Sequence, residues 1–229
     1  MIPISDINPA KNKPIITRIF IATCILTYIF LQPKEPYELF NFFYRLSAIP
    51  CELFNNTPLT ENQYLLNDCF ANKTTPIFLE KNILLSIIYA NFFHANFLHI
   101  LGNLWSFWIF GNNIEDKLGK IKFIIFILLV GLTSILFHSI LNYSSLIPIV
   151  GASGIVSGLM GAYVKLFPNA RLLVLVPFGF IFPTTIKAKF FMIVWFISQF
   201  YIAINVQGIS WEAHISGFIF GYFLVNLFK

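Results

Sequence analysis

The feature that most constrains this chain is its series of apolar stretches, several of them long enough to cross a lipid bilayer. Of its 229 residues, 57% are hydrophobic and only 11% are charged, whereas about a quarter of residues are charged in soluble domains. A spanning helix needs about 20 predominantly apolar residues. The composition therefore predicts an integral membrane protein. We expect no nucleic-acid partner, because the basic residues flank apolar stretches and do not cluster.

Six stretches are interpreted as membrane spans. The apolar stretch 82–111 is too long for one span, so residues 97–111 are taken as the second span and the preceding apolar part is expected to dip into the interface. The spans are expected at residues 15–31, 97–111, 121–141, 151–167, 190–206 and 211–228. The run 172–183 is short and contains Pro177 and Pro183, which predicts an interfacial loop. The prediction is an all-α polytopic membrane protein, a six-helix bundle forming a single domain over residues 1–229, with a long first loop at residues 32–96.

Basic residues set the expected orientation, because cytoplasmic flanks of membrane spans carry excess Lys and Arg. Such residues precede the first span, separate the second from the third and the fourth from the fifth, and end the chain. The short loops 142–150 and 207–210 have none. Both termini are therefore expected in the cytoplasm. We expect a multi-pass protein of a bacterial inner membrane whose first span is retained, since no small-residue cleavage site follows it.

This topology places several polar residues at one depth. Spans two, four and six run inward from the outside. Their outer parts carry His99 with Asn103, Ser153, and His214, while His94 comes just before span two. His99 and Asn103 are four residues apart and share a helix face. All five residues are expected in one outer layer of the membrane.

Small residues recur beside these polar groups in spans four and six. The glycines are Gly154, Gly158, Gly161, Gly217 and Gly221. Stripes of small residues let membrane helices approach closely. We expect the two spans to pack through these glycines, which brings Ser153 close to His214.

Together the polar residues fit serine-based acyl transfer. A serine hydroxyl becomes a useful nucleophile when a base takes its proton, and histidine suits that task near neutral pH. The reaction also needs donors for the developing oxyanion. The His99 ring, the Asn103 amide and the backbone N–H of Ser153 are the candidates. His214 is the candidate base.

Two glycines and one carboxylate complete the predicted site. Gly151 and Gly154 allow a tight backbone turn around Ser153 and keep its approach open. Glu212 is the one acidic residue close to His214 in sequence, and it is expected at the water surface. The prediction is therefore a Ser–His dyad.

Other interpretations fit parts of the pattern. Serine in a membrane helix usually bonds the carbonyl one turn back, and His138 is assigned to joining helices. A metal site or transporter could use His94, His99 and His214, although no acidic or cysteine ligand shares their depth. If the protein were a purely structural bundle, the shared depth of these polar residues would be a coincidence.

Two further features lie outside the predicted site. Cys51 and Cys69 share the first loop and could form a disulfide in an oxidising compartment, or remain two free thiols. Cys24, in the first span, is assigned to packing. The polar residues 112–116 are expected to end the second span in a solvated turn.

The chain resembles the rhomboid family of intramembrane serine proteases over roughly residues 91–221. The resemblance rests on HANFLHILGN (94–103), GASGIVSGLMG (151–161) and AHISGFIFG (213–221), with Phe110, Gly111, Glu115 and Gly119 between the first two. Their order and spacing match the six-helix core of the family. The resemblance implies Ser153 as nucleophile and His214 as general base. It also implies His99, Asn103 and the Ser153 amide as the oxyanion site, with His94 tying the first loop to the site.

Two positions depart from the family pattern. Many relatives have Trp-Arg shortly before the first histidine, where this chain has Leu85 and Ser86. Many also have a tyrosine under the histidine ring, four residues after the nucleophile, where this chain has Ser157. His214 is therefore expected to be less firmly stacked.

The resemblance implies an activity without metal or cofactor. It is hydrolysis of peptide bonds in or next to transmembrane segments of membrane proteins, favoured where the substrate helix is weakened. The alternative is a catalytically idle relative that binds membrane clients.

Overall fold

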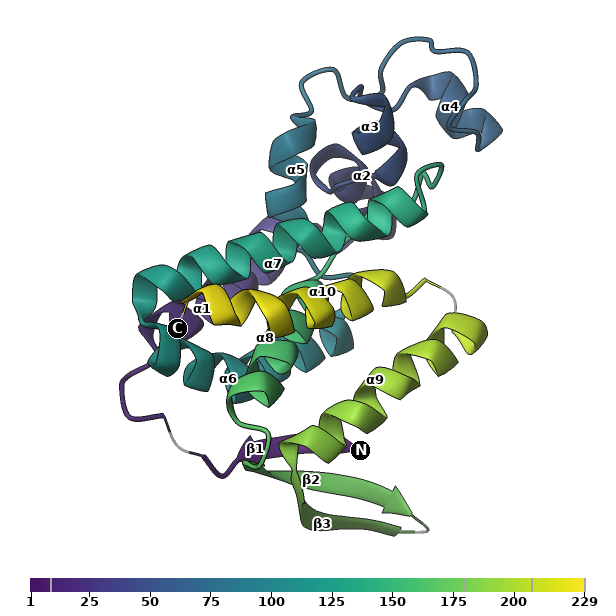
Figure 1. Ribbon diagram of the computed structural model, residues 1–229. Helices are drawn as coiled ribbons and strands as arrows, with labels where there is room; N and C mark the ends of the chain where they lie inside the picture. Colours follow the sequence, from purple (N-terminus) through teal and green to yellow (C-terminus); the bar gives the residue numbers. More distant parts are fainter. Residues whose placement is uncertain (9, 179, 207, 229) are drawn as a thin grey trace.

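The computed structural model describes residues 1–8, 10–178, 180–206 and 208–228, and it is mostly helical (Figure 1). The helices are α1 (Ile15–Leu26), continued by a π-helix η1 (Thr27–Leu31), α2 (Pro36–Leu46), α3 (Pro50–Asn55), α4 (Glu61–Leu66), α5 (Ile83–Ala90), α6 (Phe97–Leu118), α7 (Lys120–Leu141), α8 (Ser153–Leu166), α9 (Ala188–Asn205) and α10 (Trp211–Leu224), followed by a 3₁₀-helix η2 (Val225–Phe228). The strands are β1 (Ile2–Asp6), β2 (Arg171–Phe178) and β3 (Phe180–Lys187).

A helix lies at each of the six apolar stretches, and the bounds differ from the expected ones mainly at the end of α6. Among the described residues, α7 and α9 are the two helices that are each long and apolar enough by themselves to cross a membrane. The six-span count and the side on which the termini lie stay predictions.

The expectation of a solvated turn at residues 112–116 is wrong, because α6 continues to Leu118. Glu115 is only 3% exposed. Its carboxylate accepts hydrogen bonds from the backbone N–H groups of Ile16 (2.9 Å) and Thr17 (2.8 Å) and from the Thr17 hydroxyl (2.8 Å). The first N–H groups of a helix have no partner within that helix. Glu115 therefore caps α1 and joins the first apolar helix to the second.

The expectation of an interfacial loop at residues 172–183 is also wrong. Strands β2 and β3 pair antiparallel, and β1 joins them in the order β1-β2-β3. Leu172 and Val174 alternate toward the main core, as strand geometry requires. Pro183 lies in β3, an edge strand, where a missing N–H is tolerated. The short apolar run thus belongs to two strands of a sheet whose third strand, β1, comes from the N-terminal segment.

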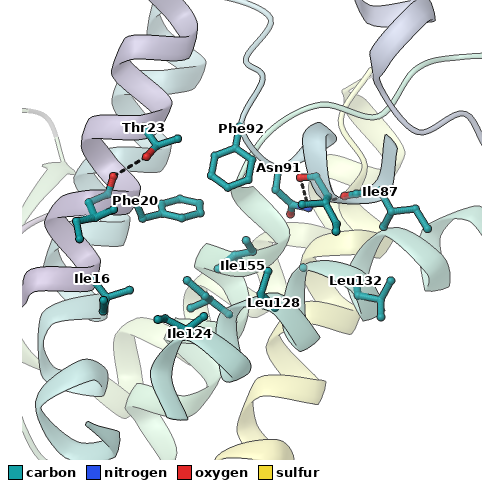
Figure 2. A pocket seen from close by; sticks show the side chains of 14 residues that line it. Ile16, Phe20, Thr23, Ile87, Asn91, Phe92, Ile124, Leu128, Leu132 and Ile155 are labelled. Carbon is teal, nitrogen blue, oxygen red and sulfur yellow. Dashed lines mark hydrogen bonds between the residues drawn. The ribbon is translucent and has the colours of Figure 1, made fainter. Parts of the chain in front are cut away.

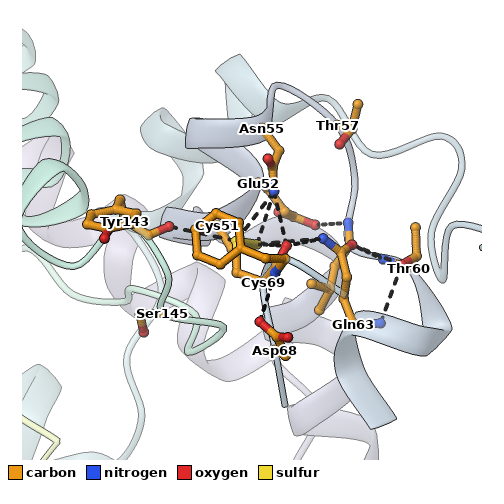
Figure 3. The surroundings of a disulfide bond; sticks show 12 residues. Cys51, Glu52, Asn55, Thr57, Thr60, Gln63, Asp68, Cys69, Tyr143 and Ser145 are labelled. Carbon is orange, nitrogen blue, oxygen red and sulfur yellow. Dashed lines mark hydrogen bonds between the residues drawn. A yellow bond between two sulfur atoms is a disulfide. The ribbon is translucent and has the colours of Figure 1, made fainter. Parts of the chain in front are cut away.

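The first loop is folded. Residues 36–80, here called the first-loop domain, contain α2, α3 and α4 and are closed by a Cys51–Cys69 disulfide (Figure 3). In Figure 1 these helices and α5 gather beside one end of α7, while the sheet lies at the opposite edge, near α9. The Cys51 N–H donates to Ser145 O (3.0 Å), and the Ile149 N–H donates to Ala48 O (2.8 Å). This small domain therefore contacts the loop that leads into α8.

Aromatic side chains fill the core between α1, α6, α7 and α8. The fully buried members include Phe107, Phe110, Phe123 and Phe126, and Phe20 stacks on Phe107 at 4.3 Å. A separate apolar cavity of about 370 Å³ lies between α1, α5 and α7, with Asn91 at its edge (Figure 2). No residue of the predicted site lines this cavity.

Candidate active site

Three helices deliver the predicted site residues from their first turns. Ser153 is the first residue of α8, His214 lies in the first turn of α10, and His99 lies in the first turn of α6 with Asn103 one turn further. Among the described residues, no hydrogen bond joins the Ser153 hydroxyl to the His214 ring. Catalytic hydrogen bonds are often long until substrate binds, so the geometry around the pair decides what it can do.

Gly151 forms the turn that leads into Ser153. Its φ is +115°, a conformation that side-chain-bearing residues rarely adopt. A Cβ at this position would lie 2.6 Å from His99 Nε2 and 3.4 Å from Asn103 Nδ2. The Gly151 N–H donates to Ala90 O at 2.8 Å. Only glycine therefore fits this turn, and the turn lies against both candidate oxyanion side chains.

The two side chains present donors to that turn. The backbone N–H of Ala95 donates to His99 Nδ1 at 3.4 Å, so the neutral ring carries its proton on Nε2, the nitrogen beside Gly151. Asn103 is 7% exposed, and its Nδ2 has no hydrogen-bond partner within the described chain. Buried donors are normally paired. An unpaired amide next to the ring N–H of His99 leaves donors available for an oxyanion, and the free N–H groups at the start of α8 can add to them.

Helices α8 and α10 pack backbone to backbone through the predicted glycines. A Cβ on Gly217 would collide with the Gly154 carbonyl, and one on Gly221 would collide with the backbone of Gly158. A Cβ on Gly161 would meet the Phe218 carbonyl in the same way. This parallel contact sets the starts of α8 and α10 side by side and so brings Ser153 and His214 into the same region.

Gln199 of α9 is a site residue that the sequence reasoning missed. His214 Nδ1 lies 2.8 Å from Gln199 Oε1, and Gln199 is 2% exposed. A strongly polar amide in the middle of an apolar helix is itself a signal of function, and it could have identified Gln199. Ser157, which replaces the tyrosine of many relatives, instead donates to Ser153 O at 2.7 Å.

Glu212 does not lie at the water surface, which corrects that expectation. Its side chain is 12% exposed and contacts His138 Nδ1 at 3.1 Å. It also accepts a hydrogen bond from Asn142 Nδ2 at 3.2 Å. The carboxylate thus links α10 to α7 through His138. Among the described residues, no hydrogen bond joins it to His214.

His94 is fully buried beside the site. Its N–H donates to Gln32 Oε1 and its carbonyl accepts from Gln32 Nε2, both at 2.9 Å. Its ring meets the His99 ring edge-on at 5.2 Å. Burial lowers the pKa of His94 to about 3, and the nearby His99 acts in the same direction. His94 is therefore a neutral ring behind His99, held in place by a residue just after the first apolar helix.

Comparison with known proteins gives one family. The model of the Rhomboid domain matches residues 81–228. A protein of Acanthamoeba polyphaga mimivirus, named as a rhomboid protein, is 30% identical over 148 residues, which are 63% of this chain and 75% of that protein. Rhomboid protein 1, mitochondrial, of Saccharomyces cerevisiae is 30% identical over 119 residues, which are 46% of this chain and 33% of that protein. The family match begins at Lys81, after the first-loop domain.

Proposed function

The chain belongs to the rhomboid family of integral membrane proteins, and on this premise we propose that it is an intramembrane serine endopeptidase. One observation carries the proposal. His99 Nε2 and the unpaired Asn103 Nδ2 converge on Gly151, two residues before Ser153. Oxyanion donors are useful only next to a nucleophile. Ser153 is the hydroxyl at that place.

The proposed reaction proceeds in two steps. The Ser153 hydroxyl oxygen attacks the carbonyl carbon of the scissile peptide while His214 Nε2 takes the hydroxyl proton. The carbonyl π-electrons move onto oxygen, where His99, Asn103 and the Ser153 N–H donate hydrogen bonds. The intermediate then collapses, the C–N bond breaks, and His214 returns the proton to the leaving amine. Water attacks the acyl-enzyme in the same way, releases a carboxylate product and restores the Ser153 hydroxyl.

The proposed substrates are membrane proteins whose transmembrane segment contains small or helix-weakening residues. A peptide bond inside a helix is shielded by that helix, and lipid supplies no replacement hydrogen bonds. A weakened segment therefore reaches Ser153 at lower cost. The site is proposed to face the outer side, where the disulfide of the first-loop domain suits an oxidising compartment. The relatives are viral and mitochondrial, so a bacterial membrane stays a prediction.

A single-span model substrate in liposomes tests the proposal. Ser153→Ala and His214→Ala should each lower the cleavage rate by at least about 10³-fold. Ser139→Ala is the matched control, because Ser139 in α7 donates to Ile135 O at 2.8 Å, the ordinary role of a membrane serine. It should cleave at the wild-type rate. Undiminished cleavage by Ser153→Ala would refute the protease assignment.

The oxyanion donors have their own test. Asn103→Ala should lower kcat by about 10²–10³-fold with little change in KM, since the amide acts on charge that exists only in the transition state. A wild-type protein that binds the substrate in a pull-down but yields no cleavage product would favour the client-binding alternative.

A further inference from the structure

We infer that Gln199 is a positioning residue for the general base, acting through His214 and not on the substrate. This inference rests on the proposed protease function. Gln199 lies in α9, on a different helix from the nucleophile, the base and the oxyanion donors. Its Oε1 is 2.8 Å from His214 Nδ1. Gln199 therefore occupies the place behind the base that an aspartate holds in a Ser-His-Asp triad.

The hydrogen bonds of the amide determine which ring nitrogen of His214 carries the proton. Gln199 Nε2 donates to Trp195 O at 3.3 Å and contacts Ser198 Oγ at 3.4 Å, which leaves Oε1 facing the ring. An amide oxygen only accepts hydrogen bonds, so His214 Nδ1 must be the protonated nitrogen. Nε2 then has a free lone pair. This is the tautomer that can take a proton from Ser153.

The position of Gln199 within α9 favours a role beyond packing. The buried residues of this helix are Ala188, Phe191, Met192 and Gln199. The first three lie near its start, and Gln199 is the one buried residue in its second half. Its neighbours Ile197, Phe200 and Tyr201 are between 49% and 67% exposed. An apolar side chain would fill this site at lower cost in a membrane helix, so the amide is best explained by its hydrogen bond.

Other groups that could orient His214 are engaged elsewhere. Glu212 contacts His138, and the Ser157 hydroxyl donates to Ser153 O. None of the aromatic contacts among the described residues involves His214. Three titratable groups interact electrostatically with the His214 ring. They are His99 of α6, His138 of α7 and Glu212, which lies on α10 like His214. Gln199 thus supplies the orientation that an aromatic ring at position 157 supplies in many relatives.

Gln199→Met tests the role, because methionine matches the length of glutamine and removes the acceptor. Cleavage of the model substrate should fall on the order of 10²-fold in kcat with KM unchanged, since only activation of the nucleophile is lost. Asn205→Met is the control on the same helix. Asn205 is exposed, and within the described part of the chain its side chain donates to Tyr201 O alone, so activity should stay at the wild-type level. Wild-type kcat in folded Gln199→Met overturns the inference.

Gln199→Glu gives a readout that a packing role does not move. A carboxylate stabilises the imidazolium more than an amide does. The acid limb of the rate profile should therefore shift to higher pH by about 1 unit or more, with activity retained at neutral pH. An unchanged profile overturns the inference. If Gln199→Met does not fold, the pH profile of Gln199→Glu alone tests the inference. Cleavage surviving in Ser153→Ala would reject the protease itself, whereas loss in Ser153→Ala with no effect at Gln199 rejects this inference alone.

Discussion

The α8–α10 pair and the first-loop domain are held together by opposite means. The helix pair has glycines where its backbones touch, and no side chain fits between the carbonyls and the facing glycines. The first-loop domain relies on polar and covalent links: a disulfide (Figure 3), a capping box at the start of α4, and an almost fully buried ion pair that joins its Glu52 to Lys81, the residue directly after the domain. Close backbone packing thus stabilises the helix pair, whereas covalent and polar links stabilise the first-loop domain.

The contrast follows from the solvent. Lipid is as apolar as leucine, so helices in a membrane gain little from burying apolar side chains and associate through close packing. In the predicted topology the first loop faces water, where a unit as small as residues 36–80 cannot bury much surface and needs covalent or ionic links. The two regions meet at the loop 142–150, which contacts the first-loop domain and continues into the turn before Ser153.

The largest expected effect comes from breaking the buried ion pair. Lys81→Met leaves Glu52 buried without its partner at 2.5 Å, and it should lower the free energy of unfolding by about 3–5 kcal/mol. Burial raises the pKa of Glu52, so the folded state resists ionisation of that carboxyl. The loss should therefore be small near pH 4 and grow as pH rises toward 8.

Thermal and denaturant unfolding in detergent at several pH values measure this loss. The control is Arg45→Met. Both side chains of the Arg45–Glu80 ion pair are exposed, so this pair should contribute less than about 1 kcal/mol to the free energy of unfolding. Equal losses in the two variants would contradict the importance of burial.

Removal of the disulfide should have the next effect. Cys51→Ser opens a link between residues 18 apart and should cost about 3 kcal/mol. The loss should be confined to the first-loop domain, where amide hydrogen exchange should rise while α8 and α10 stay protected. A reductant should reproduce the change in the wild type and leave Cys51→Ser unaffected. Equal loss of protection in α8 would show that the two regions are one unit.

A smaller effect is expected at the glycine contact. Gly221→Ala places a methyl group against the Gly158 backbone, and overpacking of this kind costs about 1–3 kcal/mol. Gly102→Ala is the matched control, because nothing lies within 4 Å of a Cβ there. That change should be neutral or slightly stabilising. If both variants unfold at the same temperature, close backbone approach does not hold the pair together.

The smallest effect is expected at the start of α4. The Thr60 hydroxyl accepts from the Gln63 N–H, and the Gln63 side chain accepts from the Thr60 N–H at 3.0 Å. Thr60→Ala should cost about 1 kcal/mol. Thr57→Ala removes an exposed hydrogen bond that the hydroxyl accepts from Lys73 Nζ. It serves as the comparison in thermal unfolding and should cost less.

The sequence alone located the apolar helices, the glycine stripes and the residues of the rhomboid motifs. These are local properties, because transfer of a segment into lipid and the spacing of glycines on one helix face depend on neighbouring residues. It also predicted that Ser153 and His214 lie in the first turns of their helices and that His99 and Asn103 lie in the outer part of theirs. The structure has Ser153, His214 and His99 in first turns and Asn103 one turn further along α6. The β-strand at residues 2–6 escaped prediction because its partner lies far away in the chain.

Only the tertiary structure decided which partners those residues have. Gln199 meets His214, Gln32 clamps His94, and Glu115 caps α1, each across two separate elements. Pairing of Cys51 with Cys69 was left open by the sequence and is present in the structure. A polar side chain in a membrane helix signals that it needs a partner, but the identity of that partner depends on which helix faces it. The sequence thus determined which residues could do chemistry, and packing determined what holds them in place.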